Sequence, residues 1–189
     1  MGVNPFVCLG IDPGSRHLGW SVLTSTETLL AAGTMSAKPA LAGLERHLWL
    51  MSGLQDLIIQ YQPDMLAYEE FVWMAKDDEH YVVGRAGLER IIGGLQTLSL
   101  SPPYPVLMPL LPSVWGQQLM RQPSHTKAQI ATIVNLRLGT TFKGDHYDNH
   151  QCDAVGIALV ALDNLRHAGI LQQRTRLPGK GATHGSAMA

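Results

Sequence analysis

The feature that most constrains the fold is the apolar run Phe6–Ile11, which ends directly at Asp12. An uninterrupted apolar run of this length (Phe-Val-Cys-Leu-Gly-Ile) is typical of a strand that is buried on both faces of a sheet. The sequence Asp-Pro-Gly-Ser at 12–15 favours a turn, because Pro fixes its own φ and Gly accepts a positive φ. We therefore expect a central strand that presents a carboxylate at its carboxyl end.

The other elements predict a mixed sheet with helices packed on it. We expect strands over 18–24 and 28–35, joined by a tight turn at Thr26-Glu27, and short strands over 65–68 and 104–108. Apolar residues recur with a 3.6-residue period over 41–61, which predicts a helix. Further helices are expected over 81–98, 113–119, 124–138 with Ser124 as N-cap, and from 149 or 150 to 168, with Gly169 as the stop. This order indicates an α/β fold with a mixed five-stranded sheet flanked by helices.

Composition supports one globular domain, which we place at 1–168, followed by a mobile C-terminal tail at 169–189. Hydrophobic residues make up 46% of the chain and charged residues 15%. No apolar run approaches the roughly 18 residues of a membrane span, and residues 1–6 do not resemble a signal peptide. Cys8 and Cys152 lie in apolar surroundings, so we expect core thiols and a cytoplasmic setting. The net charge of -1 gives no support to nucleic-acid binding, although 121–189 carries 8 basic and 4 acidic side chains.

Acidic residues stand at the ends of three apolar elements. Asp12 ends the first strand and Glu69 ends the strand after the long helix, while His150 and Asp153 share one face of the last helix because they are three residues apart. Carboxylates that lie close together repel unless a cation neutralises them. Two divalent ions roughly 4 Å apart activate water and stabilise the leaving oxygen of a phosphodiester. Oxygen ligands favour Mg²⁺, and a His ligand should widen tolerance toward Mn²⁺.

Each of these acids also has a plainer interpretation. Asp-Pro-Gly is a common turn, and Glu69-Glu70 fits an exposed strand end. An Asp in a first helical turn is favoured by the helix dipole, although Asp148 and Asn149 are the better cap candidates here. The occurrence of all four residues in this order is what the plainer interpretations explain poorly.

Three motifs resemble those of the RuvC resolvases. They are Gly-Ile-Asp-Pro-Gly-Ser-Arg at 10–16 with Gly-Trp-Ser-Val at 19–22, the segments 62–64, 67–70 and 74–76, and His-x-x-Asp-Ala-Val-Gly-Ile-Ala at 150–158. The matches occur in the family's order and span about 7–165. The resemblance implies an RNase H-like domain that resolves four-way (Holliday) junctions by paired symmetric nicks in DNA recombination and repair. It also implies a homodimer, for which the helix over 81–98 is our candidate interface, and makes a branch-migration complex a candidate partner.

The resemblance implies which residues form the catalytic and metal-binding site. The residues placed around two Mg²⁺ ions are Asp12, Glu69, His150 and Asp153. Asp12 would bridge both ions, and Mn²⁺ would also be accepted. Glu70 would face away, because neighbouring strand residues point to opposite faces. Many relatives have Asp where this chain has His150, which bears on metal preference, and Asp148 would be a substitute ligand if the helix began earlier.

The resemblance also implies contacts with DNA. Lys127 matches a basic position near the scissile phosphate, although a solvated lysine is the plainer interpretation. A second basic position of some relatives corresponds to Trp115. An aromatic wedge into the junction would be Trp73 or Phe71, with core packing as the alternative for Phe71. Arg16 of the opening motif is also expected at the DNA.

Other functions remain open on sequence alone. A related RNase H-like nuclease would act on RNA or on simpler branched DNA. The Asp-x-Gly turn also opens the phosphate site of actin-like kinases, but 189 residues leave little room for their second half. An inactive junction-binding protein is disfavoured, because unneutralised acids would repel DNA. The sequence fixes neither the cleavage preference, nor the metal, nor the source.

Overall fold

The computed structural model describes residues 4–71, 79–145 and 148–171 of the chain. The strands are β1 (Val7–Asp12), β2 (His17–Thr24), β3 (Leu29–Ser36), β4 (Met65–Glu69) and β5 (Val106–Leu110). The helices are α1 (Gly43–Tyr61), α2 (Glu79–Ser99), α3 (Pro112–Met120), α4 (Lys127–Leu138) and α5 (Asn149–His167). The strands form one sheet in the order β3-β2-β1-β4-β5, in which β2 runs antiparallel to its neighbours and β4 pairs in parallel with β1 and β5. The predicted mixed five-stranded sheet is confirmed.

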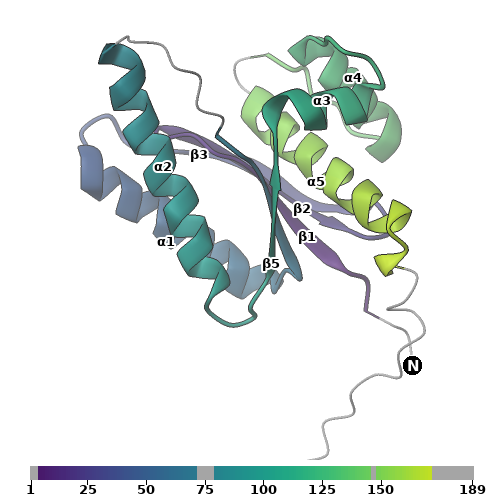
Figure 1. Cartoon of the computed structure of the whole chain (residues 1–189), viewed down its shortest axis with the longest axis horizontal. Helices are drawn as coiled ribbons and strands as arrows, with labels where there is room; N and C mark the ends of the chain where they lie inside the picture. The colour runs from purple at the N-terminus through teal and green to yellow at the C-terminus, as the bar shows by residue number, and fades with distance from the viewer. Residues whose placement is uncertain (1–3, 72–78, 146–147, 172–189) are drawn as a thin grey trace, which may run out of the picture.

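Helices cover both faces of the sheet (Figure 1). The pair α1 and α2 lies on one face, and α3, α4 and α5 lie on the other, with α5 against β1 and β2. Each layer has its own apolar cluster: Leu9 and Ile11 of β1 pack with α1 and α2, whereas Cys8 of the same strand packs with α3, α4 and α5. The central strand is therefore buried on both faces, as its continuous apolar run predicts.

Strand alternation decides which side chains at the end of the sheet face α5. In β4, Met65 and Ala67 belong to the α5 cluster, whereas Leu66 and Tyr68 belong to the α1–α2 cluster. Because successive strand residues point to opposite faces, Glu69 continues the row of Ala67 toward α5. By the same alternation, Asp12 continues the row of Cys8.

The helix α5 approaches β1 closely because a glycine stands at the contact. A Cβ atom added at Gly10 would lie 2.8 Å from the Cβ of Ala158 and 2.9 Å from the Oγ of Ser21, and closer still to the carbonyl oxygen of Ala154. The Ser21 hydroxyl donates to that same carbonyl at 2.9 Å, which fixes β2 to the helix as well. The close contact sets where the first turn of α5 lies against the end of the sheet.

Several predicted boundaries differ from the structure by one to three residues, and two of them have a clear local cause. The strand β5 begins at Val106 rather than at residue 104, because Tyr104 adopts a φ of 57° in the preceding turn. The N-cap of α4 is Thr126 rather than Ser124. The Thr126 hydroxyl accepts from the Gln129 amide at 3.3 Å, and the Gln129 side chain accepts from the Thr126 amide at 2.8 Å. This reciprocal pair satisfies two free backbone donors, so the helix begins there.

Several other features agree with the sequence. The helix α5 ends at His167, and Gly169 follows with a φ of +72°. Cys8 and Cys152 are free and buried, and burial raises the pKa of each thiol to about 12. Within the described ranges, no helix is both long and apolar enough to cross a membrane. Residues 172–189 of the predicted tail lie outside the described part of the chain.

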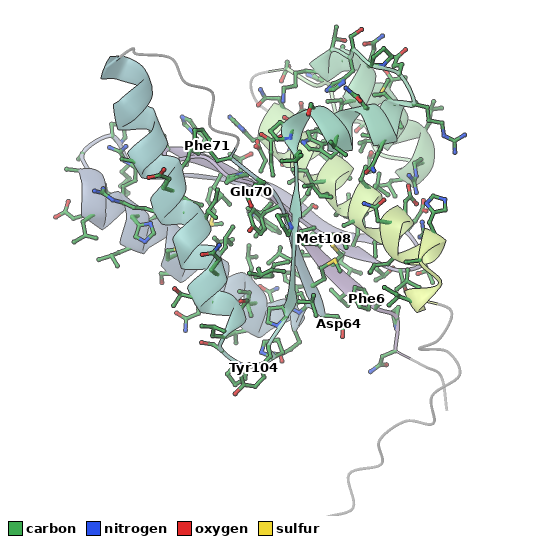
Figure 2. The ribbon with its side chains drawn as sticks, in the orientation of Figure 1. Phe6, Asp64, Glu70, Phe71, Tyr104 and Met108 are labelled. Atoms are coloured by element: carbon green, nitrogen blue, oxygen red, sulfur yellow. The ribbon has the colours of Figure 1, made fainter. Side chains whose placement is uncertain are left out.

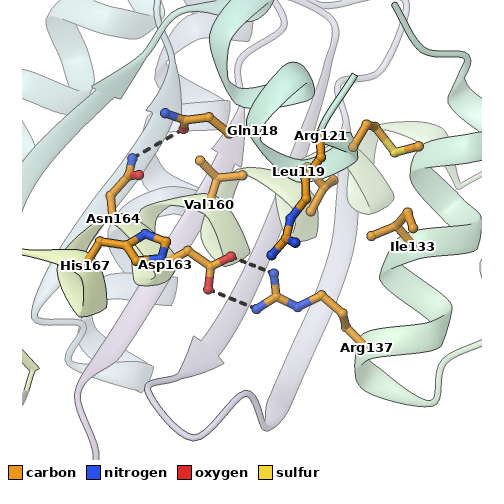
Figure 3. Close-up of a pocket in the computed structure, with 10 residues that line it drawn as sticks. Gln118, Leu119, Arg121, Ile133, Arg137, Val160, Asp163, Asn164 and His167 are labelled. Atoms are coloured by element: carbon orange, nitrogen blue, oxygen red, sulfur yellow. Dashed lines mark hydrogen bonds and ion pairs between the residues drawn. The ribbon is translucent and has the colours of Figure 1, made fainter. Parts of the chain in front are cut away.

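An ion cluster fastens the turn between β2 and β3 to α4 and α5. Arg137 bonds both Glu27, at 2.5 Å, and Asp163, at 2.7 Å, and Arg166 bonds the same two carboxylates at 2.6 and 2.7 Å. Figure 3 shows the Arg137–Asp163 pair at a pocket of about 600 Å³. Val160 and the C-terminal part of α5 line this pocket. The cluster lies along α5 away from the end that carries His150 and Asp153.

We expect Glu27→Gln to lower the free energy of unfolding by roughly 1 kcal/mol at pH 7, a modest value because the side chain is about one-quarter exposed. Burial alone would raise the pKa of Glu27, but the hydrogen bonds and charges of Arg137 and Arg166 lower it below its usual 4.5. A lowered carboxyl pKa stabilises the fold above pH 4.5, and this contribution is lost as the pH falls through the folded-state value. Urea unfolding at pH 7 and pH 3.5 should show the difference between variant and wild type shrinking at the lower pH. If the variant and the wild type differ in stability by the same amount at pH 7 and at pH 3.5, the charge of Glu27 does not stabilise the fold.

Candidate active site

The ends of two parallel strands place the first two carboxylates side by side. Ile11 of β1 pairs with Tyr68 of β4, so Asp12 and Glu69 are the next residues along the same edge. Both lie on the α5 face of the sheet by strand alternation. The parallel pairing, which brings equivalent strand ends together, is what joins two acids that are far apart in the sequence.

The first turn of α5 supplies the other two residues. His150 and Asp153 are separated by three positions and therefore share one face of the helix. The Nδ1 atom of His150 lies 2.7 Å from Oδ2 of Asp12, which joins the helix to the end of β1. The His17 ring stacks on the His150 ring with a centroid separation of 6.0 Å and an angle of 18°. All four predicted site residues are thus brought to one region.

Two further side chains contact these carboxylates. The Lys127 ammonium, at the start of α4, donates to Oδ2 of Asp153. The Nε1 atom of Trp115, in α3, donates to Oε2 of Glu69 at 2.6 Å. Each acid in the group therefore has one specific partner, and the partners come from α3, α4 and α5.

The electrostatics show a concentration of negative charge. Burial raises the pKa of Glu69, and the charges of Asp12 and Asp153 add to this against the opposing effects of Trp115 and Lys127. Burial likewise raises the pKa of Asp153, which is 3% exposed, although Lys127 opposes the change. Acids whose ionised forms are disfavoured by burial and by one another gain from a bound cation.

Two basic side chains supply part of that compensation. The hydrogen bond with Asp12 raises the pKa of His150 despite its partial burial, which favours the imidazolium. Burial alone would lower the pKa of Lys127, but the charges of Asp153, Asp12 and Glu69 raise it. The carboxylates are therefore held together by the Lys127 ammonium and the His150 ring.

The side chains of this site are of the types that bind a divalent metal ion, but in the structure they bond to one another and to Lys127. Across 4–71, 79–145 and 148–171, no three His, Cys, Asp or Glu side chains are placed to hold one metal ion together. In the structure Asp12 pairs with His150, and Asp153 pairs with Lys127. Three carboxylates and an imidazole in electrostatic contact are the ligand types that Mg²⁺ and Mn²⁺ use. The Lys127 ammonium occupies Oδ2 of Asp153.

The other predicted acids are engaged elsewhere. Glu70 accepts from the Tyr68 hydroxyl at 3.3 Å and from the Phe71 amide at 3.2 Å. Figure 2 shows Glu70 and Phe71 at the end of the sheet opposite Phe6 and Asp64. Asp148 precedes α5 and its carboxylate accepts from the amides at 143 and 144, at 2.7 and 2.8 Å. Its role as a substitute ligand is therefore disfavoured, because it holds the preceding loop.

The residues expected at the DNA are placed differently from one another. Lys127 lies among the carboxylates of the site, where it bonds Asp153. Arg16 is exposed in the turn before β2. Phe71 is half-buried and packs against the α1–α2 cluster, which supports the alternative of core packing. Trp73 lies outside the described residues.

Two contacts were not foreseen from the sequence. Trp115 was recognised only as the residue at a basic position of some relatives, and its hydrogen bond to Glu69 has no local signal because the two lie 46 residues apart. His17 opens β2 and stacks on His150, but a single His at a strand start carries no functional pattern. Both depend on how the helices pack on the sheet.

Comparison with known proteins places the chain among related sequences. Residues 8–161 match the family model described as crossover junction endodeoxyribonuclease RuvC. The RuvC of Chloroflexus aggregans is 30% identical over 134 residues, which cover 69% of this chain and 78% of that protein. The RuvC of Roseiflexus sp. is 35% identical over 81 residues, which cover 41% of this chain and about half, 48%, of that protein.

Solved structures support the fold. The RuvC of Thermus thermophilus, solved in complex with a Holliday junction substrate, superposes with a TM-score of 0.74 at 22% identity. The superposition covers 86% of this chain and 96% of that one. The RNase H-like fold expected from the sequence motifs is confirmed.

Proposed function

The chain belongs to the RuvC family of crossover junction endodeoxyribonucleases, and we propose that it cuts Holliday junctions at the edge formed by Asp12, Glu69 and Asp153. The observation that carries the assignment of the site is the convergence of these acids with His150 on one face of the sheet. A phosphodiester carries a negative charge, so such a group cuts DNA only when cations neutralise it. The same arrangement explains why the family motifs stand at strand and helix ends.

The residues that would hold divalent cations are Asp12, Glu69, His150 and Asp153. When bound, two such ions activate a water and stabilise the oxygen that leaves the cut strand. Asp12 would be the central ligand of this set, because it contacts His150 of α5 and also lies beside Glu69 of β4. The mostly oxygen ligand set favours Mg²⁺, and the imidazole favours tolerance of Mn²⁺.

Lys127 has a role in binding DNA under this proposal. Its ammonium bonds Asp153 and its side chain is half exposed, so it is free to turn toward a phosphate once a cation takes its place. Arg16, exposed at the same edge, would add a second phosphate contact. We retain Trp73 and Phe71 as the candidates for a side chain that stacks on a junction base.

We expect Lys127→Gln to weaken junction binding uniformly and to reduce its salt dependence. One lost phosphate contact lowers the slope of log affinity against log salt by about 0.9. Fluorescence anisotropy with a labelled junction at a fixed concentration of Ca²⁺, a divalent cation that carboxylates bind and that can take the place of Lys127 on Asp153, measures this slope over a range of KCl concentrations. Arg121→Gln is the matched control, because it removes an exposed positive charge beside the pocket near the other end of α5. An unchanged slope in Lys127→Gln would remove Lys127 from the DNA contact.

Paired symmetric nicks need two sites, so we propose a homodimer. Exposed apolar side chains on α1, which packs beside α2, support a protein contact on this side of the molecule. They are Leu44, Leu48 and Trp49. This is the layer that contains our candidate interface, the helix over 81–98, and light scattering after size exclusion measures the mass directly. A branch-migration complex is a candidate partner, and the free thiols suit a cytoplasmic setting.

The test is a comparison of substrates in defined metals. The protein is incubated with a labelled mobile four-way junction, a matched linear duplex and an RNA–DNA hybrid, in Mg²⁺, Mn²⁺ or EDTA. Paired symmetric nicks in the junction alone, absent in EDTA, are the expected result. Binding without cutting in either metal would indicate an inactive junction-binding protein. Equal cutting of the duplex or the hybrid would indicate the broader nuclease.

A further inference from the structure

We propose that Trp115 is a positioning residue that fixes the Glu69 carboxylate for metal binding. The inference rests on the proposed function and adds a residue to it. The indole Nε1 donates to Oε2 of Glu69 at 2.6 Å, a short hydrogen bond to an acid that belongs to the candidate metal-binding group. Trp115 is 2% exposed, so the bond is shielded from water and its direction is set by packing.

The packing around the indole holds the donor in one place. Trp115 belongs to the α5 cluster, and its ring lies over Gly156 of α5, where an added Cβ would come 3.0 Å from Cζ3 of the ring. His125 lies in the loop that follows α3, and its ring is 6.2 Å from the Trp115 ring at an angle of 49°. The ring is therefore enclosed by two elements and cannot turn its N–H away from Glu69 without disturbing the core.

An indole is suited to this task because it donates one hydrogen bond and carries no charge. It uses Oε2 of Glu69 and leaves Oε1 available as a ligand. A lysine at the same place would also bring a positive charge, which would compete with a metal ion for the carboxylate. Trp115 thus orients Glu69 without neutralising it, while Lys127 supplies the exchangeable charge at Asp153.

The alternative is that Trp115 only fills the core. That alternative predicts a loss of stability when the ring is changed, but no specific change in metal affinity. Partners that orient a metal ligand typically contribute 10–100-fold to metal affinity or activity. Measurement of metal binding by the protein alone therefore separates the two roles.

The experiment uses the full chain with Trp115→Phe, which keeps an aromatic ring and removes the N–H. Mn²⁺ affinity is measured by electron paramagnetic resonance of the free ion, without DNA. We expect Mn²⁺ to bind about tenfold more weakly to Trp115→Phe than to wild type, and junction affinity in EDTA to stay unchanged. The matched control is Trp20→Phe, a partly buried indole that packs on the α1–α2 cluster, which should bind Mn²⁺ as wild type does. In a Glu69→Gln background, Trp115→Phe should cause no further loss.

A second measurement needs no change at Trp115. In ¹⁵N-labelled protein, the Trp115 indole resonance should shift on addition of Mg²⁺, and this shift should be absent in Glu69→Gln. Wild-type Mn²⁺ affinity in a folded Trp115→Phe protein, or an indole resonance that ignores Mg²⁺ while the protein binds it, would overturn the inference and leave the proposed function standing. A wild-type protein that binds neither ion would overturn both.

Discussion

Asp12→Asn should reduce the rate of junction nicking by about 10³-fold in Mg²⁺, because a carboxylate ligand contributes several kcal/mol to the transition state and about 4 kcal/mol corresponds to this factor. The amide carries no charge and therefore binds divalent ions poorly. Its oxygen can still accept a hydrogen bond from His150, so the fold should be retained. Single-turnover cutting of a labelled junction measures the rate.

The control for this variant is Glu70→Gln. Glu70 follows Glu69 directly but bonds the Tyr68 hydroxyl on the α1–α2 face, so its loss should leave the nicking rate within a few-fold of wild type. Asp12→Asn should still bind the junction in EDTA, which separates loss of chemistry from loss of binding. An Asp12→Asn protein that cuts within tenfold of the wild-type rate would remove Asp12 from the metal-binding group.

Gly10→Val should lower the free energy of unfolding by about 3 kcal/mol, the upper end of what overpacking usually costs. The added Cβ would meet the Ala154 carbonyl and, at 2.8 Å, the Cβ of Ala158, and neither atom belongs to a side chain that can turn away. Relief requires α5 to move off β1, and α5 carries His150 and Asp153. We therefore expect loss of nicking even in the fraction that remains folded.

Urea unfolding monitored by circular dichroism measures this loss, and Gly93→Ala is the matched control. An added Cβ at Gly93 meets nothing within 4 Å, and Ala is favoured over Gly in a helix by up to about 1 kcal/mol. Gly93→Ala should therefore be as stable as wild type or more so. Equal stability of Gly10→Val and wild type would mean that α5 does not depend on its close approach to β1.

The sequence predicted the positions of the site residues better than their contacts. The motif resemblance chose Glu69, and strand alternation turned its neighbour Glu70 to the other face. The continuous apolar run was enough to predict that β1 is buried on both faces. The bonds of Trp115 to Glu69 and of Lys127 to Asp153 join residues 46 and 26 positions apart on different elements of the fold. No periodicity encodes such pairs, because they depend on how the helices pack.

The two wrong boundaries, in contrast, have local causes. Both Ser124 and Thr126 are good cap residues, and Gln129, three residues after Thr126, is the signal that separates them. The run before β5 looks extended from residue 104 onward, but Tyr104 takes a positive φ that few non-glycine residues adopt. The sequence carried the first signal, whereas the second requires the backbone itself.

The two buried thiols have a practical consequence for watching this protein at work. Thiol-reactive dyes attack the thiolate, and the pKa of about 12 at Cys8 and at Cys152 leaves almost none of it near neutral pH. A cysteine introduced at an exposed position of α1, such as Ile59, would therefore take up a fluorophore selectively with both native residues in place. A dye there would lie on the layer opposite α5, so it could report the distance to a labelled DNA arm without touching the carboxylates.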